Sequence, residues 1–311
     1  MAQPHHDPAV IAADWGTTSL RLWALDPSGN VLGEHRAPQG MSMLAPDAFH
    51  PVLEATLDAL GIPTDTPAIL CGMVGAAQGW HEAPYVSTPT DLSVLSCNVI
   101  RVQGSRPRDV RILPGLAQCS PNSADVMRGE ETILLGAIES RGLAGPACLP
   151  GTHSKWAQIE DGRITGFSTF MTGEVFSLLA QHSTLSPYLK VAAHGTERSE
   201  AFAQAVREAL EQPQSILKAL FSIRARPLLD PQIAQDMPAR LSGLLIGLEI
   251  AGQRAALTGP VTLISSGQLA RSYARAFDLA GLPFNSLSAD DMACAGLCSV
   301  ARTLWPSRFE F

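Results

Sequence analysis

The same order of strands and turns occurs twice in this sequence. Residues 10–36 contain an apolar run, the turn DWGTTS, a stretch with alternating apolar residues, the turn DPSGN and a returning stretch. Residues 148–170 repeat this order, and Gly151-Thr152 lies 135 positions after Gly16-Thr17. Alternation with a period of two predicts strands, and Gly, Asp, Asn and Pro predict turns. Each segment is predicted to be a three-stranded antiparallel meander, and the repeat predicts two domains built on one plan.

The rest of the chain alternates strand-like with helix-like patterns. Short apolar runs predict strands at residues 68–71 and 261–265. Apolar residues three and four apart predict helices near residues 46–60, 132–141, 173–182, 199–211, 238–257, 268–280 and 290–304. A chain of 311 residues has the length of about two domains. The predicted fold is mixed α/β with two lobes, residues 1–145 and 146–311.

Charge and apolar length exclude several classes of protein. The chain has 22 Lys and Arg against 29 Asp and Glu, a net charge of −7 and no basic block, so a nucleic-acid partner is not expected. The longest apolar stretch, Leu241–Gly252, is interrupted by Ser242 and Glu249 and is too short for a membrane span. The N-terminus lacks the basic segment of a signal peptide, and no cysteine pair has metal-site spacing. We expect a cytoplasmic protein without membrane partner or structural zinc.

The first turn has the composition of a phosphate-binding loop. After a buried strand, Gly16, Thr17 and Thr18 would present backbone N–H groups and hydroxyls on one side of a tight turn, which suits phosphate oxygens. Asp14, just before the turn, can hold Mg²⁺ through water. A plain hairpin turn with an aspartate cap is the alternative interpretation.

The second turn offers similar chemistry in the second lobe. Gly151-Thr152 follows another apolar run, with Lys155 close by. Leu149 stands at the position that corresponds to Asp14, so the metal carboxylate is expected from the first lobe alone. Two such loops, one from each lobe, predict that a polyphosphate binds between them.

A third loop joins a predicted strand to a predicted helix. It reads Ser265-Ser266-Gly267-Gln268, and a helix N-terminus favours anions and polar ligands. The chain contains neither the P-loop pattern GxxxxGK(S/T) nor GxGxxG after a strand. Ser266, Gly267 and Gln268 are candidate nucleotide contacts, although many ordinary strand–helix turns contain Ser-Gly.

Carboxylates at predicted helix starts are candidates for acid–base chemistry. Glu130 and Glu131 open one helix, where stabilisation of the helix N-terminus is an equally good explanation for them. Arg128, two residues earlier, can bind an anionic substrate through its planar guanidinium. Glu174 is a second helix-start glutamate with the same two explanations. Further candidate substrate contacts are His153, Gly75 and Trp80, and ordinary turn usage explains the loop of the last two equally well.

Eight segments, in chain order, resemble the 2-dehydro-3-deoxygalactonokinases: DWGTTSLRLW, CGMVGAAQGW, APY, PGL, VMRGEET, PGTHSKW, FMTGE and LSGLLIG. VMRGEET and PGTHSKW are specific signals, whereas DWGTT is shared by many actin-like kinases. The resemblance implies two ribonuclease-H-like lobes with ATP in the cleft between them. It also implies ATP-dependent phosphorylation of the terminal hydroxyl of 2-dehydro-3-deoxy-D-galactonate in galactonate breakdown. The turn Ser265-Ser266-Gly267 departs from the family, which has a Gly earlier, so the nucleotide contacts there are assigned to within about one residue.

Together the residues and the resemblance predict a mechanism. Mg·ATP is expected between the Gly16-Thr17-Thr18 and Gly151-Thr152 loops, with Asp14 organising the metal ion. Phosphoryl transfer depends on positioning and on charge neutralisation more than on covalent chemistry. Glu130 or Glu131 is expected to accept the proton of the sugar hydroxyl, as helix-start carboxylates do in related actin-like phosphotransferases.

The carboxylate of the sugar acid needs a cation. Arg21, Arg128 and Lys155 are the candidates. Three alternative functions remain open: a kinase for the gluconate epimer, an exopolyphosphatase-like phosphohydrolase, and a nucleotide switch or sugar sensor without turnover. The last is disfavoured because no residues remain for a fused DNA-binding domain. A homo-oligomer is also left open.

Overall fold

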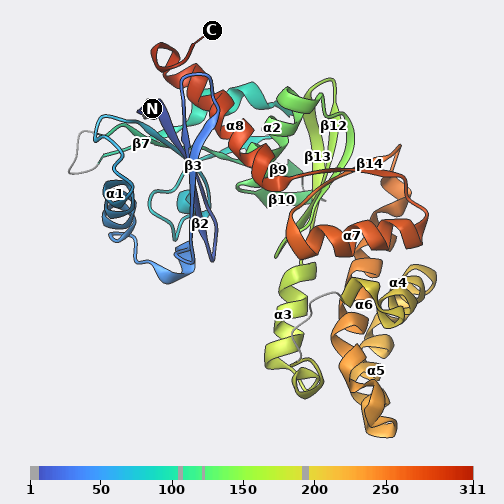
Figure 1. The fold of residues 1–311 in the computed structure, drawn as a ribbon. Coiled ribbons are helices and arrows are strands. Elements are labelled where there is room, and N and C mark those ends of the chain that lie inside the picture. Colours follow the sequence, from blue (N-terminus) through green and yellow to red (C-terminus); the bar gives the residue numbers. More distant parts are fainter. Residues whose placement is uncertain (1–6, 104–107, 121–122, 191–195, 311) are drawn as a thin grey trace, which may run out of the picture. The chain divides into compact units, whose positions relative to one another are not determined.

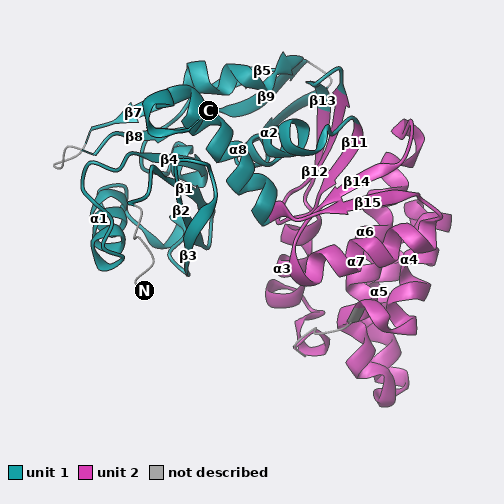
Figure 2. Ribbon diagram, turned by 45° about the horizontal axis from the view of Figure 1, so that its top comes forward, with its two compact units in different colours: residues 1–144, 160–166, 290–311 teal, residues 145–159, 167–289 magenta. Residues whose placement is uncertain are grey.

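The computed structural model describes residues 7–103, 108–120, 123–190 and 196–310 (Figure 1). The chain forms two compact units (Figure 2). Unit 1 comprises residues 1–144, 160–166 and 290–311, and unit 2 comprises residues 145–159 and 167–289. The first boundary lies within one residue of the predicted division, whereas the segments 160–166 and 290–311 belong with the N-terminal unit.

Unit 1 is built on a six-stranded sheet. Its strands are β1 (Val10–Trp15), β2 (Leu20–Leu25), β3 (Val31–Ala37), β4 (Ala68–Gly72), β7 (Ile100–Val102) and β8 (Val110–Ile112). They are ordered β3-β2-β1-β4-β8-β7. The predicted meander is confirmed, because β1 pairs antiparallel with β2 and β2 with β3. On the other side of β1 lies β4, parallel to it, and β8 is parallel to β4.

Unit 1 also contains three α-helices and several short strands outside this sheet. The helices are α1 (Phe49–Ala59), α2 (Glu130–Arg141) and α8 (Ala289–Leu304). A small second sheet is ordered β10-β9-β5 and consists of β5 (Tyr85–Ser87), β9 (Gly115–Ser120) and β10 (Ser123–Met127). These short strands, and β6 (Thr90–Asp91), fall mostly in the Pro- and Ser-rich stretch 79–123. The sequence did not predict these strands, and β5 and β6, with three and two residues, are too short to produce a periodic pattern.

Unit 2 repeats the sheet of unit 1. Its strands are β11 (Gly145–Leu149), β12 (Ser154–Glu160), β13 (Arg163–Phe170), β14 (Val261–Ile264) and β15 (Phe284–Leu287). They are ordered β15-β14-β11-β12-β13. The first residues of β13, which belong to unit 1, pair antiparallel with β6 at the edge of this sheet. β11 pairs antiparallel with β12, and β14 and β15 add parallel strands on the other side. Both units therefore place a meander beside two parallel strands in the same order, as the repeated sequence pattern predicts.

The helices of unit 2 pack around two apolar cores. They are α3 (Thr172–His182), α4 (Glu200–Glu211), α5 (Ile216–Leu229), α6 (Met237–Gln253) and α7 (Gly267–Ala280). Residues of α4, α6 and α7 share one apolar core with the sheet, and residues of α3, α4, α5 and α6 share a second. α5 was not predicted, because its exposed side includes Leu217, Phe221 and Leu228 and no polar face marks the helical period. No helix of the described residues is long and apolar enough to cross a membrane.

Two glycines allow α2 and α8 to touch through their backbones in unit 1. A Cβ atom on Gly136 would lie 2.0 Å from the carbonyl oxygen of Met292, and one on Gly296 would lie 2.0 Å from that of Thr132. Backbone atoms cannot move aside as the end of a flexible side chain can. This crossing fixes the helix that carries Glu130 and Glu131 at its start.

Gly136→Ala should therefore destabilise the protein by about 3 kcal/mol, the upper part of the range for overpacking. Gly33→Ala is the matched control, because a Cβ atom there meets nothing within 4 Å. Urea unfolding of both variants and the wild type measures the difference. Similar free energies of unfolding for the two variants would show that the helices can separate at no cost.

Candidate active site

The turn after β1 is held by its own carbonyl groups. The Gly16 N–H donates to Ser19 O at 2.9 Å, and the Gly16 carbonyl accepts from Met41 N–H at 3.0 Å. Gly40 packs against this turn so closely that a Cβ atom would lie 2.3 Å from Thr17 O. Thr17 and Thr18 are exposed. The predicted loop is thus a rigid turn that presents two threonine side chains to solvent.

Asp14 lies in a negative environment at the end of β1. It stands opposite Arg21 of β2 and Cys71 of β4 in the sheet, and it is half-buried. The pKa of Asp14 is raised to about 6, mainly by loss of water and also by the charges of Glu130 and Asp290, while the charge of Arg21 opposes the rise. Unit 1 therefore gathers three carboxylates from β1, α2 and α8 around this point.

Arg21 already forms an ion pair within the protein. Its guanidinium forms an ion pair with Asp290 in the first turn of α8, and Arg36 of β3 pairs with the same carboxylate at 2.7 Å. The structure therefore brings Arg21 to the candidate site and gives it a protein partner there.

The two glutamates at the start of α2 differ in their surroundings. Glu131 is 0% exposed and accepts hydrogen bonds from Gly129 N–H at 2.7 Å and from the Thr132 hydroxyl at 3.0 Å. The pKa of Glu131 is raised to about 8, mainly by burial and also by the charge of Glu130, although the hydrogen bonds favour the charged form. Glu130 is half-buried, and its Oε2 accepts from Arg128 N–H at 3.1 Å. Glu131 is thus held inside the first turn, whereas Glu130 reaches the neighbourhood of Asp14.

Arg128 is a buried cation with incomplete hydrogen bonding. Its side chain donates from Nη2 to Ala83 O at 2.8 Å, and its guanidinium carbon lies 4.3 Å from the centre of the Tyr85 ring. Among the described residues, Nε and Nη1 have no hydrogen-bond partner. Gly75 borders Nη1, which a Cβ atom would approach to 3.0 Å. Buried polar atoms without partners are rare in folded proteins and point to a missing ligand or water.

Trp80 belongs to the core of unit 1 rather than to this group. Its ring stacks on Phe49 of α1 with centres 6.4 Å apart, and it contacts His50. Ala83 and Tyr85 contact Arg128. The sequence analysis did not name them as candidate binding residues, because nothing local shows that a backbone carbonyl and an aromatic ring will meet a buried arginine.

The second loop, in unit 2, is fixed by the start of α3. A Cβ atom on Gly173 would lie 2.4 Å from Gly151 O, and Glu174 N–H donates to Thr152 O at 2.9 Å. His153 Nε2 lies 2.6 Å from Glu174 Oε2, so two predicted substrate residues are paired with each other. Lys155 is buried and donates to His153 O at 3.1 Å.

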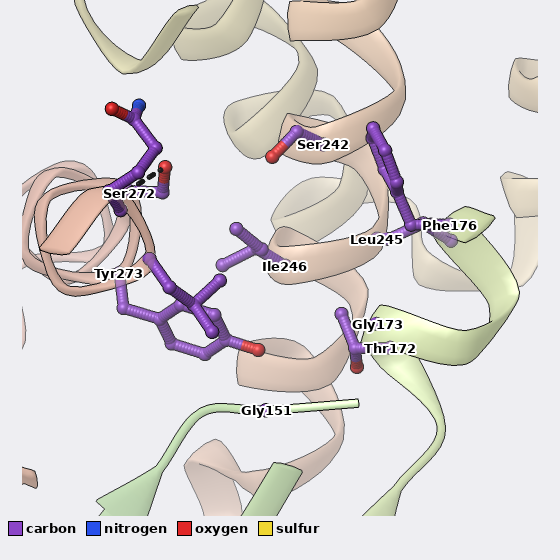
Figure 3. A pocket seen from close by; sticks show the side chains of 11 residues that line it. Gly151, Thr172, Gly173, Phe176, Ser242, Leu245, Ile246, Ser272 and Tyr273 are labelled. Atoms are coloured by element: carbon purple, nitrogen blue, oxygen red, sulfur yellow. Dashed lines mark hydrogen bonds between the residues drawn. The ribbon is translucent and has the colours of Figure 1, made fainter. Parts of the chain in front are cut away.

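A cavity of about 280 Å³ opens beside this loop (Figure 3). Its lining residues all belong to unit 2: Gly151, Thr172, Gly173, Phe176, Ser242, Leu245, Ile246, Gln268, Leu269, Ser272 and Tyr273. Of the predicted third loop, Gln268 lines the cavity, Gly267 begins α7 with φ +66°, and Ser266 is exposed outside the lining. The sequence analysis did not predict the lining residues of α3 and α6, because apolar residues of a helix face have the same pattern whether they line a cavity or pack in a core.

Asp14 fits the requirements of magnesium. Mg²⁺ keeps much of its water shell and is commonly held by one or two carboxylates together with substrate phosphates. Among the described residues, no group of three or more His, Cys, Asp and Glu side chains is arranged to hold a metal ion. A single carboxylate beside a phosphate-binding turn is thus compatible with Mg²⁺ that arrives with a nucleotide.

Comparisons with known proteins show which family the sequence resembles. The model of the 2-keto-3-deoxy-galactonokinase family matches residues 14–300. A protein of Rhizobium meliloti (strain 1021) named as a probable 2-dehydro-3-deoxygalactonokinase is 45% identical over 301 residues, covering 95% of this chain and 97% of its own. The 2-dehydro-3-deoxygalactonokinase of Escherichia coli (strain K12) is 34% identical over 299 residues, covering 94% and 98%.

Solved structures extend the likeness to three dimensions. A protein of Sinorhizobium meliloti assigned as a 2-dehydro-3-deoxygalactonokinase superposes with a TM-score of 0.91 at 45% identity, covering 96% of this chain and 97% of its own. An activator of 2-hydroxyisocaproyl-CoA dehydratase from Clostridium difficile, at 10% identity and a TM-score of 0.51 with 96% of each chain covered, shares the fold alone. The predicted α/β fold of the actin-like ATPases is confirmed by these likenesses and by the strand order of both units.

The environment of Glu131 predicts how stability changes with pH. Between its ordinary pKa of 4.5 and its folded pKa of about 8, the folded protein holds a proton that the unfolded chain has released. The contribution of Glu131 to the free energy of unfolding should therefore fall as the pH rises through this range. Glu131→Gln removes the titration, so its stability should decline less steeply with pH than that of the wild type.

Glu139→Gln, an exposed change on the same helix, is the control and should keep the wild-type slope. Urea unfolding between about pH 5 and pH 8 measures all three proteins. Equal slopes for the wild type and E131Q would contradict the assignment of a neutral, buried Glu131.

Proposed function

The chain belongs to the 2-keto-3-deoxy-galactonokinase family, and from this premise we propose how its residues carry out the reaction. The protein is a kinase that uses ATP to phosphorylate 2-dehydro-3-deoxygalactonate in galactonate catabolism. We assign the transfer to the terminal hydroxyl, the primary alcohol of the sugar acid. The remaining assignments concern which residues bind, orient and deprotonate.

Arg128 is the residue that carries the proposal. A sugar acid brings a carboxylate, and the buried guanidinium of Arg128 has N–H groups without acceptors at Nε and Nη1 among the described residues. A substrate carboxylate supplies those acceptors through charge-assisted hydrogen bonds. The other two candidate cations have protein partners, since Arg21 pairs with Asp290 and Lys155 donates to His153 O. Arg128 therefore holds the acid end of the substrate.

Glu130 is the proposed general base. It is half-buried at the N-terminus of α2, and its charge acts on Asp14. A carboxylate there is stabilised by the helix dipole and can accept the proton of the sugar hydroxyl as the phosphoryl group transfers. Glu131 instead ties the residue before the helix to the first helical turn, because its oxygens accept hydrogen bonds from Gly129 N–H and from the Thr132 hydroxyl.

Asp14 and the turn after it are the proposed contacts to the metal and to phosphate. Mg²⁺ held by Asp14 would neutralise charge on the phosphate groups. Gly16 permits close approach of the backbone, and the exposed Thr17 and Thr18 offer hydroxyl donors.

The cavity of unit 2 is the proposed nucleoside site. Its walls are mainly apolar, with Phe176, Leu245 and Ile246 on one side and Gln268 at the start of α7. Gly151 borders the cavity, so phosphates leaving it would meet the Gly151-Thr152 loop. Ser266, His153 and Glu174 lie outside the cavity lining.

Release of ADP by the purified protein tests the function. It should require Mg·ATP together with 2-dehydro-3-deoxy-D-galactonate, and the ratio of kcat/KM values for the gluconate epimer gives the selectivity. Release without any acceptor would favour the phosphohydrolase. Binding of ATP without release in any mixture would overturn the substrate assignment.

Arg128→Met should lower kcat/KM for the sugar acid by about 10- to 100-fold, the worth of hydrogen bonds to a charged group. The Kd for ADP should stay within about twofold, because Arg128 does not line the nucleoside cavity. Arg141→Met, at the other end of α2 and exposed, is the control with wild-type kinetics. Equal loss of sugar-acid and ADP binding in R128M would argue that Arg128 only supports the fold.

Glu130→Gln should lower kcat by about 100-fold or more, because the amide cannot accept a proton. Binding of ADP and of the sugar acid should remain, as titration calorimetry can measure. Glu139→Gln on the same helix should keep wild-type kcat. A near-normal kcat in E130Q would remove Glu130 from the role of base.

A further inference from the structure

A carboxylate lies buried behind the cavity of unit 2. Glu249, on α6, is 1% exposed. Its Oε1 accepts a hydrogen bond from Trp156 Nε1 at 2.8 Å, and its Oε2 accepts from the Tyr273 hydroxyl at 2.6 Å and from the Thr172 hydroxyl. The Tyr273 hydroxyl lies 2.9 Å from that of Ser154, which can donate to it in turn. One side chain thus collects a connected group of four polar partners.

These partners come from three other elements of the unit. Thr172 opens α3 and lines the cavity, and Tyr273 lines it from α7. The Tyr273 hydroxyl points towards the turn that carries Thr172 and Gly173 (Figure 3). Ser154 opens β12 directly after the Gly151-Thr152 loop, and Trp156 follows on the same strand. Glu249 therefore connects two cavity walls with the strand that leaves the phosphate loop.

Glu249 itself does not line the cavity. Any effect it has on a bound nucleotide must act through Thr172, Tyr273 and the loop. The loop is coupled to Thr172 as well, because Gly173 packs against Gly151 and Glu174 N–H donates to Thr152 O.

A core position does not need a charged group at this depth. A buried carboxylate costs free energy unless donors surround it, and well-packed apolar side chains often fill such a site with equal or better stability. Burial raises the pKa of Glu249, while hydrogen bonds from Thr172, Tyr273 and Trp156 favour its charged form. The carboxylate fixes the orientation of each side chain that donates a hydrogen bond to it, which an apolar residue cannot do.

We propose that Glu249 is a positioning residue for the nucleotide, which holds Thr172 and Tyr273 in the cavity wall and the Gly151-Thr152 loop beside it. This inference rests on the nucleoside site proposed above. It assigns to Glu249 the role that carboxylates behind a binding site have when they orient the groups that touch the ligand.

Glu249→Gln tests this directly. The amide has the same shape but presents an NH₂ group to at least one donor, so the orientation of Thr172 or Tyr273 is lost. The Kd for ADP, measured by titration calorimetry, should rise by about 10-fold or more, as when outer partners of a site are removed. KM for ATP should rise with it, while the Kd and KM for the sugar acid stay within about twofold.

Glu54→Gln is the matched control. It makes the same change in a buried carboxylate of unit 1 that accepts a hydrogen bond from Arg108 Nε, and Glu54 does not line the cavity. Its melting temperature should fall while its Kd for ADP stays at the wild-type value. Tyr273→Phe removes a donor that does line the cavity and should raise the Kd, and the double variant E249Q/Y273F should show less than the product of the two single effects.

The outcomes separate this proposal from its premise. If wild-type protein does not bind ADP, the nucleoside site and this proposal both fall. If wild type binds ADP and E249Q binds it equally well, only the positioning role falls. A parallel loss of ADP and sugar-acid binding in E249Q would also overturn it, since that pattern marks general destabilisation. Should E249Q fail to fold, an unchanged Kd in Y273F would overturn the proposal.

Discussion

Each sheet is organised around a central strand buried along nearly its whole length, β1 in unit 1 and β11 in unit 2. Such a strand has neighbours on both sides, so its backbone is satisfied by the ladder and its side chains are apolar. Polar groups can therefore appear only where the strand ends. In both units that end leads into a Gly-Thr turn, and glycine contacts bring a helix start close by: Gly129 beside Gly72 in unit 1, and Gly173 beside Gly151 in unit 2.

The charges of unit 1 follow from this placement. Asp14 ends β1, Glu130 begins α2 and Asp290 stands in the first turn of α8, so three carboxylates come together where helix N-termini stabilise negative charge. Burial is the main cause of the raised pKa of Asp14, the charges of Glu130 and Asp290 add to it, and the charge of Arg21 opposes it. Arg21 and Arg36 both pair with Asp290. A site with surplus negative charge is suited to a divalent cation and to taking up a proton, the two requirements of the proposed transfer.

The two units contain buried carboxylates that are satisfied in different ways. Glu131 bonds to its own helix start, through Gly129 N–H and the Thr132 hydroxyl, and its pKa of about 8 favours the neutral acid at physiological pH. Glu249 is instead surrounded by side-chain donors from other elements. The first arrangement stiffens one helix terminus, whereas the second ties distant segments together, which is why only the second suggests a positioning role.

Sequence alone determined the repeated meanders, most helices and the three loops, because turn chemistry and apolar periodicity act over a few residues. It also brought Arg128 and the pair Glu130-Glu131 forward as candidates, but it could not rank them, because ranking depends on burial and partners. The tertiary structure decided that Glu131 is enclosed and that Arg128 lies over Tyr85 with unpaired N–H groups among the described residues. It also decided that α3, α6 and α7 enclose a cavity backed by Glu249. Trp156 and Glu249 are 93 residues apart, and no local pattern encodes such a contact, because it arises only when packed helices and strands bring distant segments together.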